Sequence, residues 1–398
     1  MKVYFAPCGI GLGHVGRCLP VAEALERIGV DTVFSTYGQG VAYLKEREAH
    51  TESAPPIGFS VRHDGTVDFR WSLVSPGPRL LPIVLNQLAK EIRIIEKHEP
   101  DVVVADSRVT PIIAARLLRI PSIVILNQYS IIIPRRRRFL NLARIADGFN
   151  LTVIGRLWSL ADHVLVTDFP EPYTLSAANL RVPSSRLGNL RLVGPVIPVK
   201  PENLEERDRL RKEFGVGDDR KIIFAAISGP VGEKKHLIEI LMRILPKLPE
   251  RYAVFMSTGT PGASSKPVRK GNLTVFPWLE ERFELMKASD IIISRAGHNT
   301  LSQAMYFGKP AIVIPTPSHT EQFGNALRAS SIGFAEILKQ EDLNYRSLLE
   351  GIERLSHSEA LLQRTEEIQL KVAGIDAVNS ILKMICNSAE VIPRVCSA

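Results

Sequence analysis

A short polar turn in the C-terminal half has the composition of a phosphate site. The turn, SRAGHNT, follows the apolar run DIIIS and precedes an amphipathic stretch, so we expect a helix capped near Asn299 or Thr300. The free backbone N–H groups and the positive dipole end of such a helix bind phosphate or pyrophosphate. Gly297 allows the oxygens a close approach, and Arg295 and His298 could add positive charge. The turn therefore predicts an anion site.

Further groups that suit hydroxyls lie near this turn. Gln303 stands one helical turn beyond it and could bond a ribose hydroxyl, while Ser228 and Gly229 end another apolar run with more backbone N–H donors. Glu321 and Gln322 follow the next apolar run and supply acceptors and donors for sugar hydroxyls. An ordinary capped helix would leave the Glu-Gln pair unexplained. Sites for pyrophosphate, ribose and sugar together predict a nucleotide-sugar ligand.

The N-terminus carries a second turn of interest, in KVYFAPCGIGLGH. Its glycines, Gly9, Gly11 and Gly13, let the backbone turn tightly and approach a ligand. Their G-x-G-x-G spacing departs from the dinucleotide pattern G-x-G-x-x-G, and the next apolar run ends without the acidic residue that holds a ribose. His14 begins the following helix, where the dipole disfavours the imidazolium and favours a neutral general base. A histidine that only caps or packs at the turn is the structural alternative.

Apolar runs alternating with amphipathic stretches define the elements that must position these turns. Runs such as DVVVAD, SIVIL, KIIFAAIS and AIVIP are β-branched and almost wholly apolar, as expected for parallel strands buried on both faces. The sequence therefore predicts an α/β fold of two doubly wound, Rossmann-like parallel-sheet domains that face a cleft. Ligands bind beyond the carboxyl ends of such strands.

The domain boundary is indicated by a Pro-rich stretch followed by a charged one, which places the linker near 197–205. We expect residues 1–196 to form an acceptor-binding domain and residues 206–375 to form a nucleotide-sugar-binding domain. Residues 376–398 are expected to form a C-terminal helix or tail able to pack back on the first domain.

The composition argues against several other classes of protein. The 398 residues are 45% hydrophobic and 23% charged, and the net charge of +8 suits a phosphate-bearing partner or an anionic membrane surface. An aromatic fraction of 7%, without zinc-finger, RNP or helix-turn-helix patterns, argues against nucleic acid. No apolar run approaches the roughly 18 residues of a membrane span, and the N-terminus is unlike a signal peptide. Four cysteines without metal-type spacing, Cys8, Cys18, Cys386 and Cys396, are expected to be free thiols in a reducing compartment. We expect a cytoplasmic protein, at most peripheral to a membrane.

Both turns are similar to motifs of a known enzyme family. The segment from Phe276 to Ala326 resembles the donor-binding half of GT-B glycosyltransferases. It is especially similar to the bacterial N-acetylglucosaminyltransferase that completes lipid II and to its archaeal and eukaryotic relatives acting on polyprenyl-linked sugars. The N-terminal GIGLGH resembles that family's Gly-rich turn and histidine.

The resemblance implies a role for particular residues of the donor site. Gly297, Asn299 and Thr300 match a turn that holds phosphate, and the acidic-Gln pair matches residues that hold the donor sugar. FPWLE matches the segment that receives the uracil ring, and Gln303 departs from the family's ribose-binding Glu. The sequence has no Asp-x-Asp motif suited to diphosphate chelation, so we expect neither a metal nor another cofactor. The predicted donor-binding residues are Ser228, Gly229, Trp278, Arg295, Gly297, His298, Asn299, Thr300, Gln303, Glu321, Gln322 and Asn325.

Acceptor-binding groups are expected at strand ends of the first domain. Asp106, which ends DVVVAD, is well placed to orient His14 as a base. The predicted acceptor-binding residues are Gly11, Gly13, Asn127 and Gln128. Beyond them, IIIPRRRRF combines apolar and basic residues that suit anionic headgroups, although a solvated basic turn explains it equally well. The basic residues of this patch are Arg135, Arg136, Arg137 and Arg138.

These inferences predict an inverting, metal-independent transfer of a sugar, most simply N-acetylglucosamine, from a UDP-sugar to a lipid-linked saccharide at the cytoplasmic face of the cell membrane. His14 would take the proton of the acceptor hydroxyl, and the helix end at Gly297 would stabilise the departing diphosphate. Two alternatives remain. One is a UDP-sugar 2-epimerase of the same fold, which needs carboxylates in the cleft. The other is a non-catalytic membrane-recruiting subunit of a glycosyltransferase.

Overall fold

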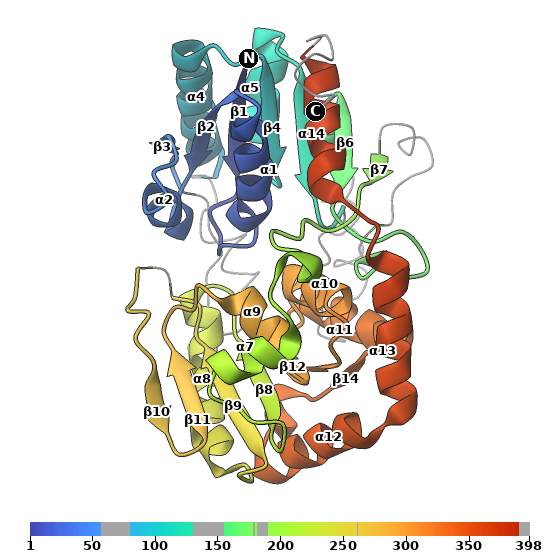
Figure 1. The fold of residues 1–398 in the computed structure, drawn as a ribbon. Helices are drawn as coiled ribbons and strands as arrows, with labels where there is room; N and C mark the ends of the chain where they lie inside the picture. The colour runs from blue at the N-terminus through green and yellow to red at the C-terminus, as the bar shows by residue number, and fades with distance from the viewer. Residues whose placement is uncertain (57–79, 130–154, 178–179, 181–189, 261, 390–398) are drawn as a thin grey trace, which may run out of the picture.

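The computed structural model describes residues 1–56, 80–129, 155–177, 180, 190–260 and 262–389. Within them the chain forms two α/β domains stacked end to end, the N-terminal one uppermost in Figure 1. Each domain is built on a seven-stranded sheet with helices packed on both faces. The predicted fold of two doubly wound, Rossmann-like domains is thereby confirmed.

The N-terminal sheet is parallel and has the strand order β3-β2-β1-β4-β5-β6-β7. In its centre Pro7 of β1 is in register with Asp106 of β4, so these two strands end side by side. Its strands are β1 (Lys2–Pro7), β2 (Asp31–Thr36), β3 (Thr51–Ser53), β4 (Val102–Asp106), β5 (Ser122–Leu126), β6 (His163–Val166) and β7 (Leu190–Leu192). The helices around it are α1 (Val15–Arg27), α2 (Gln39–Lys45), α4 (Leu80–His98) and α5 (Thr110–Leu118).

The C-terminal sheet has the order β10-β11-β9-β8-β12-β13-β14, with only β10 antiparallel. Because β8, β12 and β13 are neighbours, the turns at their carboxyl ends also lie together. The strands are β8 (Lys221–Ala226), β9 (Tyr252–Ser257), β10 (Val268–Lys270), β11 (Leu273–Phe276), β12 (Ile291–Ser294), β13 (Ala311–Val313) and β14 (Ala335–Ile337). The helices are α7 (Arg207–Glu213), α8 (Val231–Ile244), α9 (Arg282–Ala288), α10 (His298–Tyr306), α11 (Thr320–Ile332), α12 (Tyr345–His357) and α13 (Glu359–Val372), with 3-10 turns at Pro201–Asn203, Leu245–Lys247 and Gln340–Asp342.

The chain crosses between the domains twice. The first crossing contains the turn at Pro201–Asn203, and the second leads from α13 to α14 (Ala377–Ser388). α14 lies beside α1 in Figure 1, where its apolar face, including Ile381 and Ile385, joins the core of the N-terminal domain. A Lys200–Asp376 ion pair of 3.0 Å links the two crossings. The last helix is thus a structural part of the first domain.

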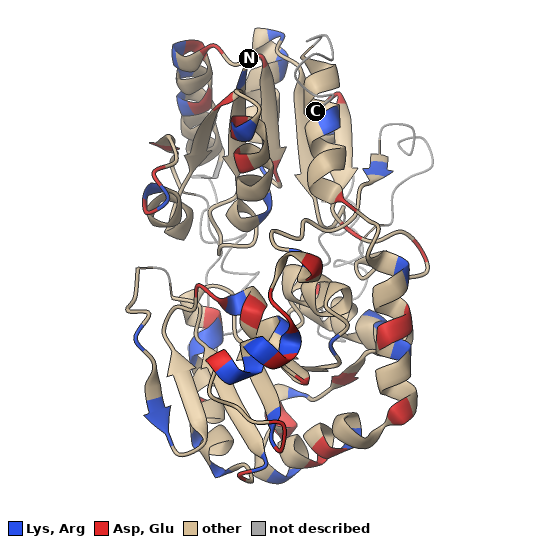
Figure 2. Cartoon of the chain, viewed as in Figure 1, with Lys and Arg blue, Asp and Glu red and all other residues tan. Residues whose placement is uncertain are grey.

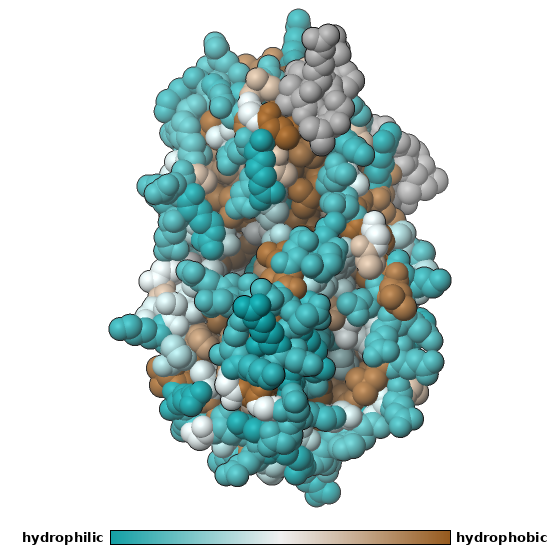
Figure 3. Space-filling model, viewed as in Figure 1, coloured by the Kyte–Doolittle hydropathy of each residue, from teal (hydrophilic) through white to brown (hydrophobic). Residues whose placement is uncertain are grey.

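Apolar strands fill the cores, and charged residues cover the outside. All five residues of β4 and of β5 are buried, as their continuous apolar runs predict. In Figure 2 basic and acidic residues intermix along α7, α12 and α13, and the face in Figure 3 is mainly hydrophilic with hydrophobic atoms showing between the elements. Among the described helices, none is long and apolar enough to cross a membrane.

Two of the cysteines match the expectation of free thiols. Cys8 and Cys18 are free and buried. Cys386, in α14, is disulfide-bonded, so the expectation of a free thiol was wrong for this residue. Cys396 lies outside the described residues.

Candidate active site

His14, Arg17 and Asp106 form one hydrogen-bonded group at the carboxyl ends of β1 and β4. His14 Nδ1 lies 2.7 Å from Asp106 Oδ1. Arg17 donates from Nε to Asp106 Oδ2 at 2.9 Å and from Nη2 to Oδ1 at 2.7 Å. Arg17 and Asp106 are buried, whereas the side chain of His14 is 22% exposed. The imidazole is therefore the part of this group that a substrate can reach.

Two contacts of His14 Nδ1 bear on which imidazole nitrogen carries the hydrogen. Arg17 Nη2 also lies 2.9 Å from His14 Nδ1, but a guanidinium can only donate. A hydrogen on Nδ1 would suit the shorter contact, 2.7 Å, with the Asp106 carboxylate and would leave Nε2 with its lone pair, whereas a hydrogen on Nε2 would suit the contact with Arg17. Burial alone would raise the pKa of Asp106, but the charge of Arg17 and the bonds with His14 lower it to about 2. Asp106 is thus an ionised acceptor near neutral pH and can orient His14 as a general base.

The glycine turn between β1 and α1 brings His14 to this position. A Cβ atom on Gly9 would lie 2.0 Å from the carbonyl oxygen of Tyr37, and Gly11 has φ +71, so both positions require glycine. Sequence reasoning missed Arg17. Its spacing of three residues from His14 puts the two side chains on one face of α1, and that spacing was the available signal.

The predicted phosphate turn of the C-terminal domain lies against the glycine turn. α10 begins at His298 with Gly297 as its N-cap, earlier than the expected cap at Asn299 or Thr300, because Gly297 is the residue with extended backbone angles. Asn299 lies inside the helix, and its Nδ2 donates to the carbonyl oxygen of Gly13 at 3.0 Å. Its Oδ1 accepts from Arg17 Nη1 at 3.5 Å. The anion-binding end of α10 therefore faces the base group across the domain junction.

Two predicted donor-binding side chains are used inside the C-terminal domain. Arg295 is buried, and its guanidinium donates to the carbonyl oxygen of Glu233 at 2.5 Å and to the hydroxyl of Thr316. Asn325 is fully buried and donates to the carbonyl oxygen of Ala296 at 3.2 Å. Ala296 has φ +58, an unusual conformation for a residue with a side chain. Both side chains thus hold the shape of the turn, and the donor contacts expected of them stay predictions.

His298 contacts the N-terminal domain. It is 3% exposed, and its Nε2 lies 3.2 Å from Oδ2 of Asp168, which follows β6 of the other domain. The pair is an ion pair only when the imidazole is protonated. The negative charge of Asp168 is also bonded by the backbone N–H and hydroxyl of Ser176. His298 is therefore part of the buried junction between the domains, and its expected contact with phosphate stays a prediction.

The Glu-Gln pair lies at the start of α11 and meets the first domain. Asn127, at the end of β5, donates from Nδ2 to Glu321 Oε1 at 2.8 Å. Gln322 accepts at Oε1 from the backbone N–H and the hydroxyl of Thr316, at 2.8 and 2.7 Å. The Nε2 group of Gln322 is thus the part that can bond a ligand. The structure brings together a predicted acceptor-binding residue and a predicted donor-sugar residue.

The remaining predicted site residues surround the same junction. Trp278 packs edge-on against Tyr43 of α2, with 5.8 Å between ring centroids. A Cβ atom on Gly11 would lie 3.8 Å from Pro230, which follows Ser228 and Gly229. Gln303 is 6% exposed within α10. Thr300 and Gln128 are half-buried at the start of α10 and after β5. The predicted residues Arg135, Arg136, Arg137 and Arg138 lie outside the described residues.

Two charged residues at the start of α8 were missed by sequence reasoning. Burial and the negative charge of Glu321 raise the pKa of Glu233 to about 7, although Arg295 opposes the shift. Burial lowers the pKa of Lys234 to about 8, and its Nζ donates to the carbonyl oxygen of Gly259 at 2.7 Å. Shifts of this kind cluster at functional sites. Their sequence signal, GEKK at a helix start, is indistinguishable from an ordinary charged helix.

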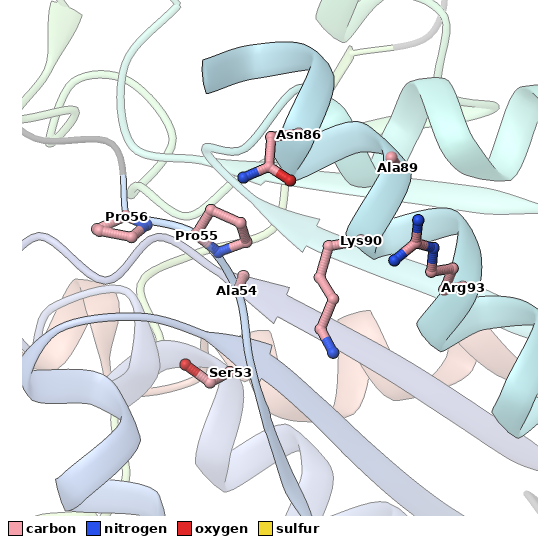
Figure 4. Close-up of a pocket in the computed structure, with 8 residues that line it drawn as sticks. All are labelled: Ser53, Ala54, Pro55, Pro56, Asn86, Ala89, Lys90 and Arg93. Atoms are coloured by element: carbon pink, nitrogen blue, oxygen red, sulfur yellow. The ribbon is translucent and has the colours of Figure 1, made fainter. Parts of the chain in front are cut away.

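A separate hollow of about 340 Å³ lies between the end of β3 and the middle of α4 (Figure 4). Ser53, Asn86, Lys90 and Arg93 supply its polar side chains. None of the predicted donor- or acceptor-binding residues lines this hollow. It is a feature of the N-terminal domain outside the junction that holds His14 and Asn299.

Comparison with known proteins identifies the type of molecule. The model for the glycosyltransferase family 28 C-terminal domain matches residues 231–378. An uncharacterized glycosyltransferase of Methanosarcina acetivorans is 25% identical over 97% of this chain and 98% of that protein. A UDP-N-acetylglucosamine–N-acetylmuramyl-(pentapeptide) pyrophosphoryl-undecaprenol N-acetylglucosamine transferase of Desulforamulus reducens is 26% identical over 52% of this chain and 58% of that protein.

Solved structures show the same fold over nearly the whole chain. Acinetobacter baumannii MurG superposes with a TM-score of 0.60 at 20% identity, covering 97% of this chain and 99% of that one. The glycotransferase of kitacinnamycin superposes with a TM-score of 0.68 at 15% identity, covering 98% and 99%. The chain therefore has the GT-B fold of glycosyltransferases, its residues 231–378 match the family 28 C-terminal domain, and it is similar to MurG.

Proposed function

We propose that this protein transfers N-acetylglucosamine from UDP-N-acetylglucosamine to a lipid-linked saccharide at the cytoplasmic face of the membrane. The donor and the lipid-linked acceptor are suggested by the printed activity of the relative from Desulforamulus reducens. The observation that carries the proposal is the junction itself. A histidine oriented by a buried aspartate faces a helix N-terminus suited to a diphosphate, with Asn299 3.0 Å from the glycine turn.

The proposed reaction is a single displacement at the anomeric carbon. The acceptor hydroxyl forms the new C–O bond as the bond to the UDP oxygen breaks, and His14 Nε2 takes the hydroxyl proton. UDP leaves with the electron pair, and the N–H groups at the start of α10 stabilise its negative charge. Attack from the face opposite the leaving group inverts the anomeric configuration. The proposed role of α10 requires no metal for the displacement.

The sugar would lie between the two domains. Gln322 Nε2 and the carboxylate of Glu321 can bond sugar hydroxyls, and the Asn127–Glu321 contact then sets the donor sugar beside the acceptor side of the junction. Trp278 would lie near the uracil ring, and Gln303 near the ribose. Donor binding must break or share the bonds that Asn127 and Gly13 make with Glu321 and Asn299.

The test is a defined assay with UDP-N-acetylglucosamine and a short-chain polyprenyl-diphosphate sugar. Mass spectrometry of the lipid product should show the addition of one N-acetylhexosamine, and NMR should show an anomeric configuration opposite to that of the donor. Parallel reactions with UDP-glucose and UDP-N-acetylgalactosamine measure donor preference, and a reaction in EDTA measures metal dependence.

Each other outcome contradicts a particular part of the proposal. Turnover only with another UDP-sugar would overturn the donor assignment, and turnover only after Mg²⁺ or Mn²⁺ is restored would overturn the role of α10. Epimerised UDP-sugar formed without acceptor would favour the 2-epimerase alternative. Stimulation of a partner transferase, without activity of its own, would favour the membrane-recruiting subunit.

A further inference from the structure

Three potential metal ligands gather at an edge of the N-terminal domain. His50 directly precedes the edge strand β3, Glu52 lies within β3, and His98 is the last residue of α4. The carbonyl oxygen of His98 accepts from Lys2 Nζ at 2.9 Å, which places it at the amino end of β1. This end of the strand is remote from the carboxyl end that leads to His14. The cluster is therefore separate from the candidate active site.

The three side chains are already arranged around a common point. One ligand atom from each can be chosen so that all lie within 4.8 Å of one another. His98 Nε2 lies 3.0 Å from Glu52 Oε1, and the rings of His50 and His98 meet edge to face with 4.9 Å between centroids. The backbone holds His50 in place, because its carbonyl oxygen accepts from the N–H of Phe34 in β2 at 2.7 Å. Small side-chain rotations would bring all three ligands onto one ion.

Two imidazoles and one carboxylate are a ligand set that zinc uses in proteins, with a fourth position open to water. Ligands bonded at about 2.0–2.2 Å in a tetrahedral site lie roughly 3.3 Å apart, close to the His98–Glu52 separation. We propose that His50, Glu52 and His98 bind a divalent transition-metal ion of the zinc class. This proposal departs from the sequence-based expectation of a chain without metal, and it is independent of the proposed transfer reaction.

Lys97 is the natural competitor for this ion. Its Nζ donates to Glu52 Oε1 at 2.6 Å, but its side chain is 64% exposed and can turn away into solvent. Removal of the lysine charge should therefore strengthen metal binding. If the three residues formed only an ion-pair cluster that binds no metal, replacing Lys97 would not strengthen metal binding.

A bound ion would join the two elements that flank residues 57–79. β3 precedes that segment and α4 follows it, and the same two elements line the hollow in Figure 4. An ion held by both elements would fix their separation. Because an ion that binds only the folded state stabilises that state, it would raise the unfolding temperature. The ion therefore has a structural effect that can be measured without any substrate.

The experiment uses the full chain without a histidine tag, because a tag would bind the same metals. After dialysis against EDTA and then buffer, Zn²⁺ is titrated in by calorimetry, and Co²⁺ is added separately to record its visible absorption. The variants are His50→Ala, which changes an exposed residue, and Lys97→Met. His357→Ala is the matched control, because His357 is exposed on α12 and bonds only the carbonyl oxygen of Glu353.

The proposal expects one equivalent of Zn²⁺ per chain and a rise in unfolding temperature. His50→Ala should weaken binding by more than about tenfold, the size of effect seen even when a residue that only hydrogen-bonds a metal ligand is changed. Lys97→Met should tighten binding, and His357→Ala should leave it unchanged. The absence of stoichiometric binding, or equal affinity in wild type and His50→Ala, would overturn the proposal. A loss of binding in His357→Ala would place the metal elsewhere and overturn it as well.

Discussion

Arg17 holds both carboxylate oxygens of Asp106 in a buried fork, with Nε 2.9 Å from Oδ2 and Nη2 2.7 Å from Oδ1. His14 Nδ1 lies 2.7 Å from the same Oδ1, so one arginine fixes the orientation of the carboxylate that contacts the proposed base. The same guanidinium reaches Asn299 of the phosphate turn. Arg17 is thus the positioning residue that links the acceptor and donor sides of the junction.

The first prediction concerns Arg17. Arg17→Lys keeps a positive charge near Asp106 but loses the bidentate fork, because an ammonium is a point charge. Misplacement of a reacting group can cost about 100-fold, so we expect turnover to fall by up to about this factor while donor affinity changes little. Steady-state kinetics and calorimetry with the donor measure both, and Arg27→Lys, exposed at the end of the same helix, is the control. Equal turnover in Arg17→Lys and wild type would contradict the positioning role.

The second prediction concerns stability in acid. The pKa of Asp106 is lowered from its ordinary value to about 2 in the folded protein. The carboxylate therefore stabilises the fold fully above about pH 4, and this contribution is lost as pH falls toward 2. It amounts to on the order of 2 kcal/mol.

Chemical denaturation of wild type and Asp106→Asn at several pH values between 5 and 2 tests this contribution. Other carboxylates titrate in both proteins, so the difference between the two slopes isolates Asp106. The wild type should lose more unfolding free energy than Asp106→Asn over the window. Parallel curves would mean that Asp106 is not held ionised by Arg17.

The third prediction concerns the base. His14→Ala should lower turnover by about 10²–10⁴-fold, the usual share of general-base catalysis, with little change in affinity for the UDP-sugar. Product formation and donor calorimetry separate the two effects. His236→Ala, an exposed histidine of α8, is the matched control. Near-normal turnover in His14→Ala would mean that His14 is only a structural residue of the turn. Asp106 would then be the next candidate for the general base.

The fourth prediction concerns the donor site. Asn299→Ala and Gln322→Ala should each weaken donor binding, because a hydrogen bond left unmade at a buried site costs about 1–3 kcal/mol. Calorimetry compares the affinities for UDP-N-acetylglucosamine and for UDP alone. Gln322→Ala should weaken the binding of UDP-N-acetylglucosamine much more than that of UDP, whereas Asn299→Ala should weaken the binding of both ligands. Asn379→Ala, exposed on α14, should bind as wild type does. Unchanged affinity in both site variants would remove the donor assignment.

The fifth prediction concerns the basic patch. Replacement of Arg135, Arg136, Arg137 and Arg138 by Ala should reduce flotation with anionic liposomes, since each basic residue near such a surface contributes about 1 kcal/mol. High salt should have the same effect on the wild type. Neutral liposomes are the control. If the variant bound anionic liposomes as well as the wild type does, and independently of salt, the patch would be a solvated turn with no role in membrane binding.

The sequence by itself determined the two-domain fold and the identity of the two turns. Buried parallel strands are apolar on both faces, so runs such as DVVVAD and SIVIL predicted the strands of the two sheets. Ligands of such sheets bind beyond the carboxyl ends of the strands, which indicated where the site lies. The tight turn at Gly9 and Gly11 could also be predicted, because a close backbone approach and a positive φ both require glycine.

Only the tertiary structure decided which polar side chains face the junction. Local spacing could not show that Arg295, His298 and Asn325 satisfy buried partners, because those partners come from distant segments of the chain. The Arg17–Asp106 fork joins residues 89 positions apart, and the Asn299–Gly13 bond spans 286. A buried charge or amide must find a partner wherever the fold supplies one, and the sequence alone does not contain that pairing.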